Sequence, residues 1–403
     1  MFVARQPIFD RHGKVWGYEL LFRSSAMQTK FDGTEATSAT RQVISNSMLS
    51  IGLDRLLQGK QAFINFGREM VLQDWYTALP KDSTIIELTE DIQPDAEIVD
   101  AVRRMRGQGY RIALDDFQPS PEMDPLIELA HMIKVEMHTP KAQQEAMLKE
   151  FQARGIRMLS EKVETDSDQR WARSVGYDYF QGHFFARPVV VKGKQIPANK
   201  IQCLQLLQEA HRPEIDFTRL TALVSRDVSF SYKLLRYANS ARYGRSAEIQ
   251  SIRRALVAMG ECGIRKWIAI AALPAIAADK PRELITQSLV RGRFCELLGQ
   301  ASGQGIEDQA FLVGLFSMLD ALLDRPLEEA LGELGLAPLL DSVLRGQASE
   351  DCPLNRIYQL VRRYEMADWD EVERLASRLG TPTEQIGAAY REALPWADEM
   401  ARA

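Results

Sequence analysis

The sequence is poor in cysteine and has no long apolar run. Its 403 residues include four cysteines, all in the second half, widely spaced and without a C-x-x-C pair. This spacing disfavours a zinc site or a disulfide framework and is typical of free thiols in a reducing compartment. The chain does not open with a signal-peptide pattern, and its longest apolar stretch, 267–278, is too short to span a bilayer. We therefore expect a cytoplasmic protein with no membrane partner.

Positive charge and histidine are also scarce. The formal net charge is −5, which disfavours binding of DNA or RNA duplexes through bulk positive charge. Only five histidines occur, and none lies beyond His211. Apolar residues make up 45% of the chain, enough for ordinary buried cores, and the length favours two domains.

Short apolar runs alternate with helical patterns in the first half of the chain. Helical patterns cover 96–106 and 140–154, and the strand-like runs are 62–66, 84–88, 111–115, 132–135, 157–160 and 179–182. This alternation predicts a parallel sheet in a barrel or a doubly wound fold. A polar segment with Gly and Pro, 191–197, is interpreted as a linker, after which helical periodicity continues. We predict an α/β domain at 1–194 and an all-α domain at 195–403.

Polar side chains fall at the ends of the predicted strands. They are Glu19, Asn65, Glu87, Asp115, Asp116, Lys134, Glu161 and Gln181. In a barrel the carboxyl ends of the strands converge, so these carboxylates would meet and repel each other unless a cation held them. Oxygen ligands select Mg²⁺ or Mn²⁺, and a pair of such ions suits phosphodiester cleavage. The alternative is that each residue merely caps its strand and faces water. Lys134 disfavours that alternative, because it stands between Ile133 and Val135 and would need a charged partner when buried.

Six motifs of the first domain together resemble those of an EAL domain, a family of cyclic di-GMP phosphodiesterases. They are Gln6-Pro7-Ile8, Glu19-Leu20-Leu21-Phe22-Arg23, Glu87-Leu88-Thr89-Glu90, Asp115-Asp116-Phe117, Glu161-Lys162-Val163-Glu164-Thr165 and Gln181-Gly182. The resemblance implies a TIM-like α/β barrel that opens cyclic di-GMP to linear pGpG with Mg²⁺ or Mn²⁺.

The resemblance also implies a role for each matched residue. Glu161 is the expected general base, with Lys134 assisting, and Glu90 is expected to brace a loop. The expected metal ligands are Glu19, Asn65, Glu87, Asp115, Asp116 and Glu161. The expected substrate-binding residues are Gln6, Arg23, Glu164 and Gln181.

The sequence departs from the family pattern beside the predicted site. The loop 118–125, Gln-Pro-Ser-Pro-Glu-Met-Asp-Pro, lacks the family's glycines, Glu136 replaces an aspartate, and Lys162 replaces a glycine. Two alternatives to hydrolysis therefore remain: a receptor that binds cyclic di-GMP without cleaving it, and a scaffold that binds neither metal nor nucleotide. Because the family's loop supports dimerisation, a homodimer is a further expectation of the resemblance.

The second half resembles an HDOD domain, a relative of the HD phosphohydrolases. The resemblance rests on Leu234-Leu235-Arg236 and Ala238-Asn239-Ser240-Ala241, followed by Ser251-Ile252, Ala255 and Gly260. HD chemistry needs several histidines around metal. This half has only His211, and Ser317 and Met318 stand where a related enzyme would carry His and Asp. We therefore expect a non-catalytic domain that binds a signalling protein of unknown identity.

Overall fold

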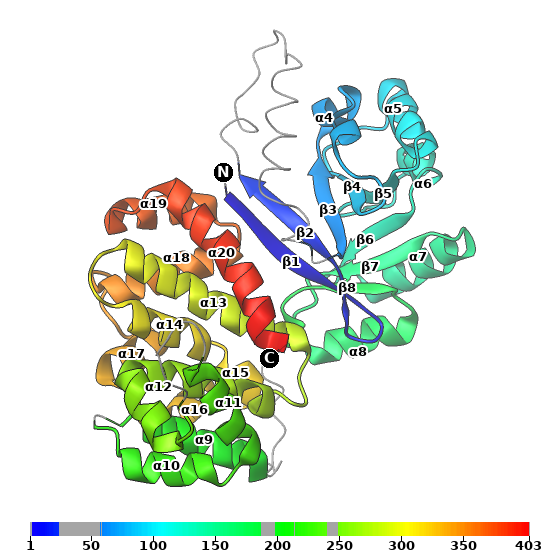
Figure 1. The fold of residues 1–403 in the computed structure, drawn as a ribbon. Coiled ribbons are helices and arrows are strands. Elements are labelled where there is room, and N and C mark those ends of the chain that lie inside the picture. Colours follow the sequence, from blue (N-terminus) through cyan, green and yellow to red (C-terminus); the bar gives the residue numbers. More distant parts are fainter. Residues whose placement is uncertain are drawn as a thin grey trace. The chain divides into compact units, whose positions relative to one another are not determined.

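The computed structural model describes residues 2–23, 57, 59–186, 198–212, 214–239 and 249–402. The chain divides into two compact units, with the boundary between Phe185 and Ala186 (Figure 1). The predicted linker at 191–197 lies outside the described residues.

The first unit contains a closed eight-stranded barrel in sequence order. Its strands are β1 Phe2–Asp10, β2 Val15–Arg23, β3 Gln61–Phe66, β4 Thr84–Leu88, β5 Arg111–Leu114, β6 Met132–Glu136, β7 Arg157–Glu161 and β8 Tyr179–Gln181. The strands β2 to β8 run parallel, whereas β1 is antiparallel to both neighbours. A tight turn explains this reversal: Asp10 accepts hydrogen bonds from the backbone N–H groups of His12 and Lys14, and Gly13 adopts a φ of 72°. So short a connection joins only antiparallel strands. The TIM-like barrel is confirmed.

Helices cover the outer face of the barrel (Figure 1), and two of them, α5 and α8, begin at side-chain caps. They are α4 Arg68–Leu72, α5 Ala96–Gly107, α6 Asp124–Ile127, α7 Lys141–Ala153 and α8 Asp166–Val175, with 3₁₀ turns η1 Trp75–Ala78, η2 Pro121–Met123 and η3 Phe184–Ala186. Asp95 caps α5 by accepting from the Ile98 N–H, and Thr165 and Asp168 form a capping box at α8. The apolar face of α5 is buried against the sheet in the main core.

Two layers of side chains fill the barrel interior. The lower layer is apolar and contains Ile8, Phe63, Ile85, Ala113, Met132 and Leu159, with Trp16 and Tyr179 packed against it. Side chains on a strand alternate between faces, so the residue two positions further on also points inward. At those positions stand Asn65, Glu87, Asp115, Lys134, Glu161 and Gln181. The strand period therefore places a polar layer at the carboxyl ends of the strands, directly above an apolar floor.

The second unit is helical, as predicted. Its helices are α9 Ala198–Ala210, α10 Phe217–Ser225, α11 Val228–Ala238, α12 Ile252–Ile276, α13 Arg282–Ala301, α14 Glu307–Phe316, α15 Leu319–Leu323, α16 Leu327–Leu334, α17 Pro338–Leu344, α18 Pro353–Glu365, α19 Trp369–Leu379 and α20 Thr383–Arg402. Gly260, with a φ of 68°, interrupts α12. At Gly314 a Cβ would lie 2.5 Å from the Arg291 carbonyl oxygen, so glycine is required where α14 meets α13.

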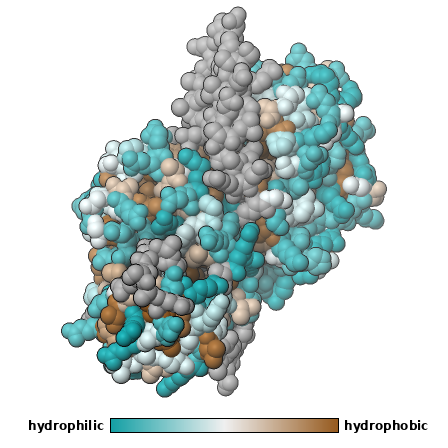
Figure 2. Space-filling view, viewed as in Figure 1, coloured by the Kyte–Doolittle hydropathy of each residue, from teal (hydrophilic) through white to brown (hydrophobic). Residues whose placement is uncertain are grey.

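On the face drawn in Figure 2, the coloured surface is mostly hydrophilic, with apolar residues in small separate patches. Among the described residues, the large apolar side chains with the highest exposure are Val228, Tyr232 and Val257 of the helical unit. Over the same ranges, no helix is both long and apolar enough to cross a bilayer.

Candidate active site at the carboxyl end of the barrel

Four carboxylates converge on one buried ammonium group. The Lys134 Nζ lies 2.6 Å from Asp115 Oδ1, 2.8 Å from Glu87 Oε1, 2.8 Å from Glu161 Oε1 and 3.5 Å from Glu19 Oε2. Lys134 and Glu87 are fully buried, and Glu19 and Glu161 are nearly so. A buried charge is tolerated when opposite charges surround it, and here four strands and the residue that follows β5 contribute to one such cluster.

Amide side chains extend this cluster towards β1 and β8. The Asn65 Nδ2 donates to Glu19 Oε1 at 3.0 Å, and the Gln181 Nε2 donates to Glu19 Oε2 at 2.6 Å. Gln181 also donates to Gln6 Oε1 at 3.2 Å. Strand register sets these contacts, because Gln6 pairs with Glu19, and Asn65 pairs with Glu87. The structure thus brings Gln6, Glu19, Asn65 and Gln181 together with the Lys134 cluster.

The environment separates the acidities of the carboxyl groups. Burial raises the pKa of Glu87 well above its usual value and that of Glu161 to about 8, although Lys134 opposes both shifts. Burial also acts on Glu19, but the Lys134 charge and the hydrogen bonds from Gln181 and Asn65 hold its pKa below the usual value. Burial would lower the pKa of Lys134, yet the surrounding carboxylates raise it well above the usual value. A proton acceptor tuned towards neutral pH and a permanent cation therefore lie side by side.

A second charge cluster lies on the rim and contains two of the departures from the family pattern. The Lys162 ammonium contacts the Glu136 carboxylate and lies 3.9 Å from Asp116 Oδ2. Lys162 adopts a φ of 51° and Asp116 a φ of 40°, a region that side chains other than glycine, Asn and Asp rarely occupy. The substituted glutamate and lysine thus pair with each other beside Asp116, and neither residue was among the predicted site residues.

The oxygen atoms of the site fit a hard divalent cation. Buried oxygens that accept no hydrogen bond within the described ranges include Asn65 Oδ1, Glu87 Oε2, Asp116 Oδ1 and Glu161 Oε2. Unsatisfied buried acceptors are costly, and a cation would compensate them. In this structure Lys134 stands among the carboxylates, and no three His, Cys, Asp or Glu side chains of the described residues form a ready-made ligand set. The donor chemistry therefore fits Mg²⁺ or Mn²⁺, and the side chains would have to turn towards the ion.

Three further predicted residues lie outside the central cluster. Glu90 is exposed and shares a hydrogen bond with Asp116, which raises the pKa of Glu90 and links its loop to the rim. Glu164 is exposed just before the cap of α8. The backbone of Arg23 pairs with Phe2 in the barrel, but its side chain lies outside the described part of the chain.

The helical unit holds Ser317 and Met318 in structural contacts, at the positions where a related enzyme would carry His and Asp. The Ser317 hydroxyl accepts a hydrogen bond from Arg291 at 2.7 Å and donates to the Gly314 carbonyl, and Met318 is buried. In the core of this unit the Glu296 carboxylate pairs with both Lys266 and Arg293. These contacts stabilise the packing of helices without offering an open ligand.

Comparison with known proteins identifies both halves. The model of the EAL domain family matches residues 1–188, and that of the HDOD domain matches residues 196–323. "Cyclic di-GMP phosphodiesterase CdgJ" of Vibrio cholerae serotype O1 is 33% identical over 100% of this chain and 93% of its own length. "Uncharacterized protein YuxH" of Bacillus subtilis is 31% identical over 99% of this chain and 98% of its own. A solved EAL protein from Vibrio cholerae O395, in a form bound to cyclic di-GMP, is 23% identical over 46% of this chain and 91% of that chain, with a TM-score of 0.35.

The chain thus combines a closed barrel, which carries a carboxylate cluster at the carboxyl ends of its strands, with a helical unit. The chain belongs to the family of proteins that join an EAL domain to an HDOD domain, and it is similar along its length to CdgJ and YuxH.

Proposed function

We propose that this protein hydrolyses cyclic di-GMP to linear pGpG in a divalent-metal-dependent reaction. The observation that carries the proposal is the convergence of Glu19, Glu87, Asp115 and Glu161 on Lys134 at one end of the barrel. A relative 33% identical over the whole chain is named as a cyclic di-GMP phosphodiesterase.

The residues take distinct roles in this reaction. Glu19, Asn65, Glu87, Asp115, Asp116 and Glu161 would hold Mg²⁺ or Mn²⁺, which, when bound, would acidify water and neutralise charge on the phosphate. Glu161 accepts the proton of the attacking water, whose oxygen bonds to phosphorus while the bond from phosphorus to the leaving ribose oxygen breaks. Lys134 fixes the carboxylates by charge, and Gln6, Arg23, Glu164 and Gln181 orient the substrate.

The proposal is tested by following product formation chromatographically with purified full-length protein. We expect pGpG to accumulate with Mn²⁺ or Mg²⁺ and to stop when the metal is chelated. Calorimetry with cyclic di-GMP in the same buffers supplies the control for binding. If cyclic di-GMP binds but no pGpG forms with either metal, the protein is a receptor instead. If cyclic di-GMP neither binds nor is cleaved, the protein is a scaffold.

One feature favours the alternative that the protein is a receptor, which binds cyclic di-GMP without cleaving it. This feature is the altered loop 118–125, which follows Asp116 and Phe117. Ser120 caps the 3₁₀ turn η2 and accepts a hydrogen bond from the Glu122 N–H, and α6 follows directly. This loop is built from local turns and prolines, whereas flexible glycines are absent from it.

The helical unit is proposed to bind a signalling protein and to carry out no catalysis. The support is its lack of histidine beyond His211 and the structural engagement of Ser317. The exposed Val228, Tyr232 and Val257 are available for contact with a partner.

Replacing Lys162 with glycine should tighten Mn²⁺ binding at the rim. Its ammonium neutralises Glu136 and lies near Asp116, so removal leaves more negative charge for a metal ion. We expect a gain of about tenfold in affinity, measured by calorimetry. Glycine also adopts this left-handed φ without strain, so the free energy of unfolding should rise by about 1 kcal/mol.

Lys162→Ala separates the two effects, because it removes the charge but keeps the backbone strain. It should match glycine in Mn²⁺ affinity and fall below it in melting temperature. Lys149→Ala, at an exposed position of α7, serves as the control and should change neither quantity. Unchanged Mn²⁺ affinity in both Lys162 variants would show that this lysine does not compete with metal.

A further inference from the structure

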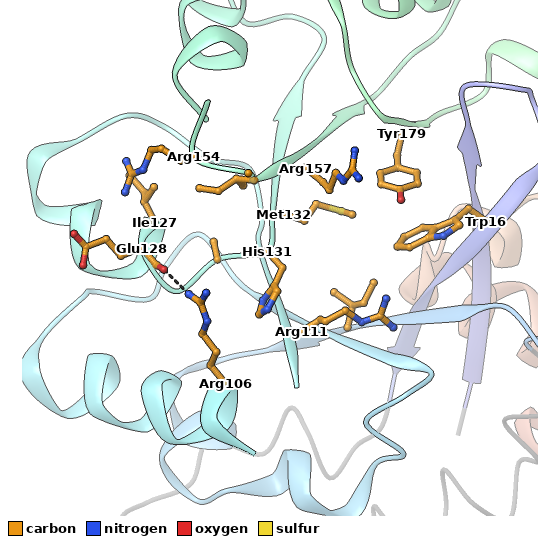
Figure 3. Close-up of a pocket in the computed structure, with 14 residues that line it drawn as sticks. Trp16, Arg106, Arg111, Ile127, Glu128, His131, Met132, Arg154, Arg157 and Tyr179 are labelled. Atoms are coloured by element: carbon orange, nitrogen blue, oxygen red, sulfur yellow. Dashed lines mark hydrogen bonds between the residues drawn. The ribbon is translucent and has the colours of Figure 1, made fainter. Parts of the chain in front are cut away.

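A cavity of about 380 Å³ opens at the other end of the barrel, where the strands begin (Figure 3). Its wall includes the first residues of four strands, Arg111, Met132, Arg157 and Tyr179. Met132 and Tyr179 belong to the apolar layer inside the barrel or pack against it. The cavity is therefore separated from the carboxylate cluster by that layer, and none of its lining residues takes part in the proposed hydrolysis.

Positive charge dominates this cavity. Four arginines line it, Arg106, Arg111, Arg154 and Arg157, against a single acidic residue, Glu128. Arg154 and Arg157 have carboxylate partners, Glu150 at 3.6 Å and Asp178 at 2.9 Å. Four guanidinium groups around one cavity favour an anionic ligand, because each presents a planar fork of donors that matches phosphate or carboxylate.

Two of the arginines have only uncharged acceptors among the described residues. Arg111 is half-buried, and its guanidinium donates to the Gln61 side chain and, at 3.1 Å, to the Asp82 carbonyl. Arg106 donates to the backbone carbonyl of Glu128. Arg106 is exposed, whereas Arg111 is partly buried, and the Asp82 charge offsets part of that burial. The remaining cost of burying the Arg111 charge would be recovered by an anion bound in the cavity. Burial accordingly lowers the pKa of Arg111.

His131 adds a directed donor between these arginines. Its Nδ1 accepts a hydrogen bond from the Ile112 N–H at 3.2 Å, so the neutral ring carries its proton on Nε2. All three side chains line the same cavity, and Figure 3 shows the His131 ring between Arg106 and Arg111. Burial lowers the pKa of His131, and the charges of the two arginines lower it further. Arg106, Arg111 and His131 therefore form one group of donors, here called the anion subsite.

Aromatic rings close the far side of the cavity. Trp16 and Tyr179 stack with ring centroids 4.1 Å apart, and Figure 3 shows them beyond Met132, on the side towards which Arg157 and Arg111 extend. Planar apolar surface beside guanidinium groups is suited to a flat heterocycle. The volume lies at the lower end of the range of about 300–1,000 Å³ that is usual for small-molecule sites.

We propose that this cavity binds a small organic phosphate of nucleoside monophosphate size. Its phosphate lies on the anion subsite, and its flat ring lies against Met132 and the Trp16–Tyr179 pair. The ligand would occupy the amino-terminal end of the barrel while cyclic di-GMP occupies the carboxyl-terminal end.

The test is calorimetric titration of full-length protein with AMP, with EDTA present so that no divalent ion supports binding at the carboxylate cluster. Adenosine and inorganic phosphate are titrated separately. We expect AMP to bind more tightly than either, because only AMP fills both the anion subsite and the aromatic side. Inorganic phosphate binding as tightly as AMP would overturn the assignment of the ring.

Arg106→Gln and Arg111→Gln should each weaken AMP binding about tenfold, by loss of a charge-assisted contact. Arg103→Gln is the matched control, because Arg103 lies on the same helix as Arg106 but is exposed and paired with Asp100, outside the cavity. It should leave AMP affinity unchanged. Arg106 is itself exposed, so Arg106→Gln should remain folded if Arg111→Gln does not. No AMP binding to the wild type, or equal affinity in the folded arginine variants, would overturn the proposal.

Discussion

Lys134→Met should destabilise the barrel by about 3–5 kcal/mol, the cost of removing one partner from a buried ion pair, and should abolish turnover. Among the described residues, Lys134 is the cation that Glu19, Glu87, Asp115 and Glu161 share. Methionine fills similar volume without charge, so the carboxylates would then repel each other in a site shielded from water. Denaturant unfolding, read together with the turnover assay, measures both effects.

The loss of folding stability in Lys134→Met should increase as pH rises. Without Lys134, the folded pKa values of the four carboxyl groups lie above their unfolded values, so the folded state binds more protons than the unfolded chain. Stability of the variant relative to wild type should therefore fall as pH rises through the range in which these groups ionise, and recover in acid. Lys149→Met is the control and should stay within about 0.5 kcal/mol of wild type at every pH, because Lys149 is exposed on α7. A variant as stable as wild type at high pH would mean that the carboxylates are not held by Lys134.

The polar layer could be predicted because strand periodicity is a local property. The run expected at 84–88 is β4, and those expected at 132–135 and 157–160 are β6 and β7 with one residue added to each. Once these strands close into a barrel, Glu87, Lys134 and Glu161 must face inward at one end. The apolar neighbours of Lys134 also predicted that its side chain is buried, but they did not predict how many carboxylates contact it.

Other features depend on contacts between segments that no local pattern records. The direction of β1 follows from the turn at Asp10 and Gly13, which the alternation of strands and helices does not predict. The pairing of Glu136 with Lys162 requires that β6 and β7 align Glu136 beside Glu161, and it requires a left-handed turn at Lys162. Taken alone, each substitution removes a residue that is typical of the family. Taken together, Glu136 and Lys162 form an ion pair.

The basic cavity was missed for the same reason. Arg106 lies in the last turn of a helix, Arg111 and Arg157 begin strands, and His131 precedes another strand. An arginine at the solvent-facing start of a strand is ordinary, and only barrel closure brings these side chains around one cavity. The sequence signal that remains is the repeated basic residue at the first position of β5 and β7, opposite the end that carries the acids.

Glu161→Gln should lower kcat about 100- to 10,000-fold while leaving cyclic di-GMP binding in place, because it removes a proton acceptor but keeps the side-chain volume. Glu161 lies 2.8 Å from Lys134 at the end of β7, and burial raises its pKa to about 8, so it is positioned and tuned to take a proton from water. Lys134 keeps Glu19, Glu87 and Asp115 as partners, so the variant should remain folded, and Glu145→Gln, at an exposed position of α7, is the control. Turnover and calorimetric binding are measured for both variants with Mn²⁺.

Near-normal kcat in Glu161→Gln would show that Glu161 is not the base. Loss of binding together with turnover would instead assign it to holding the metal and substrate.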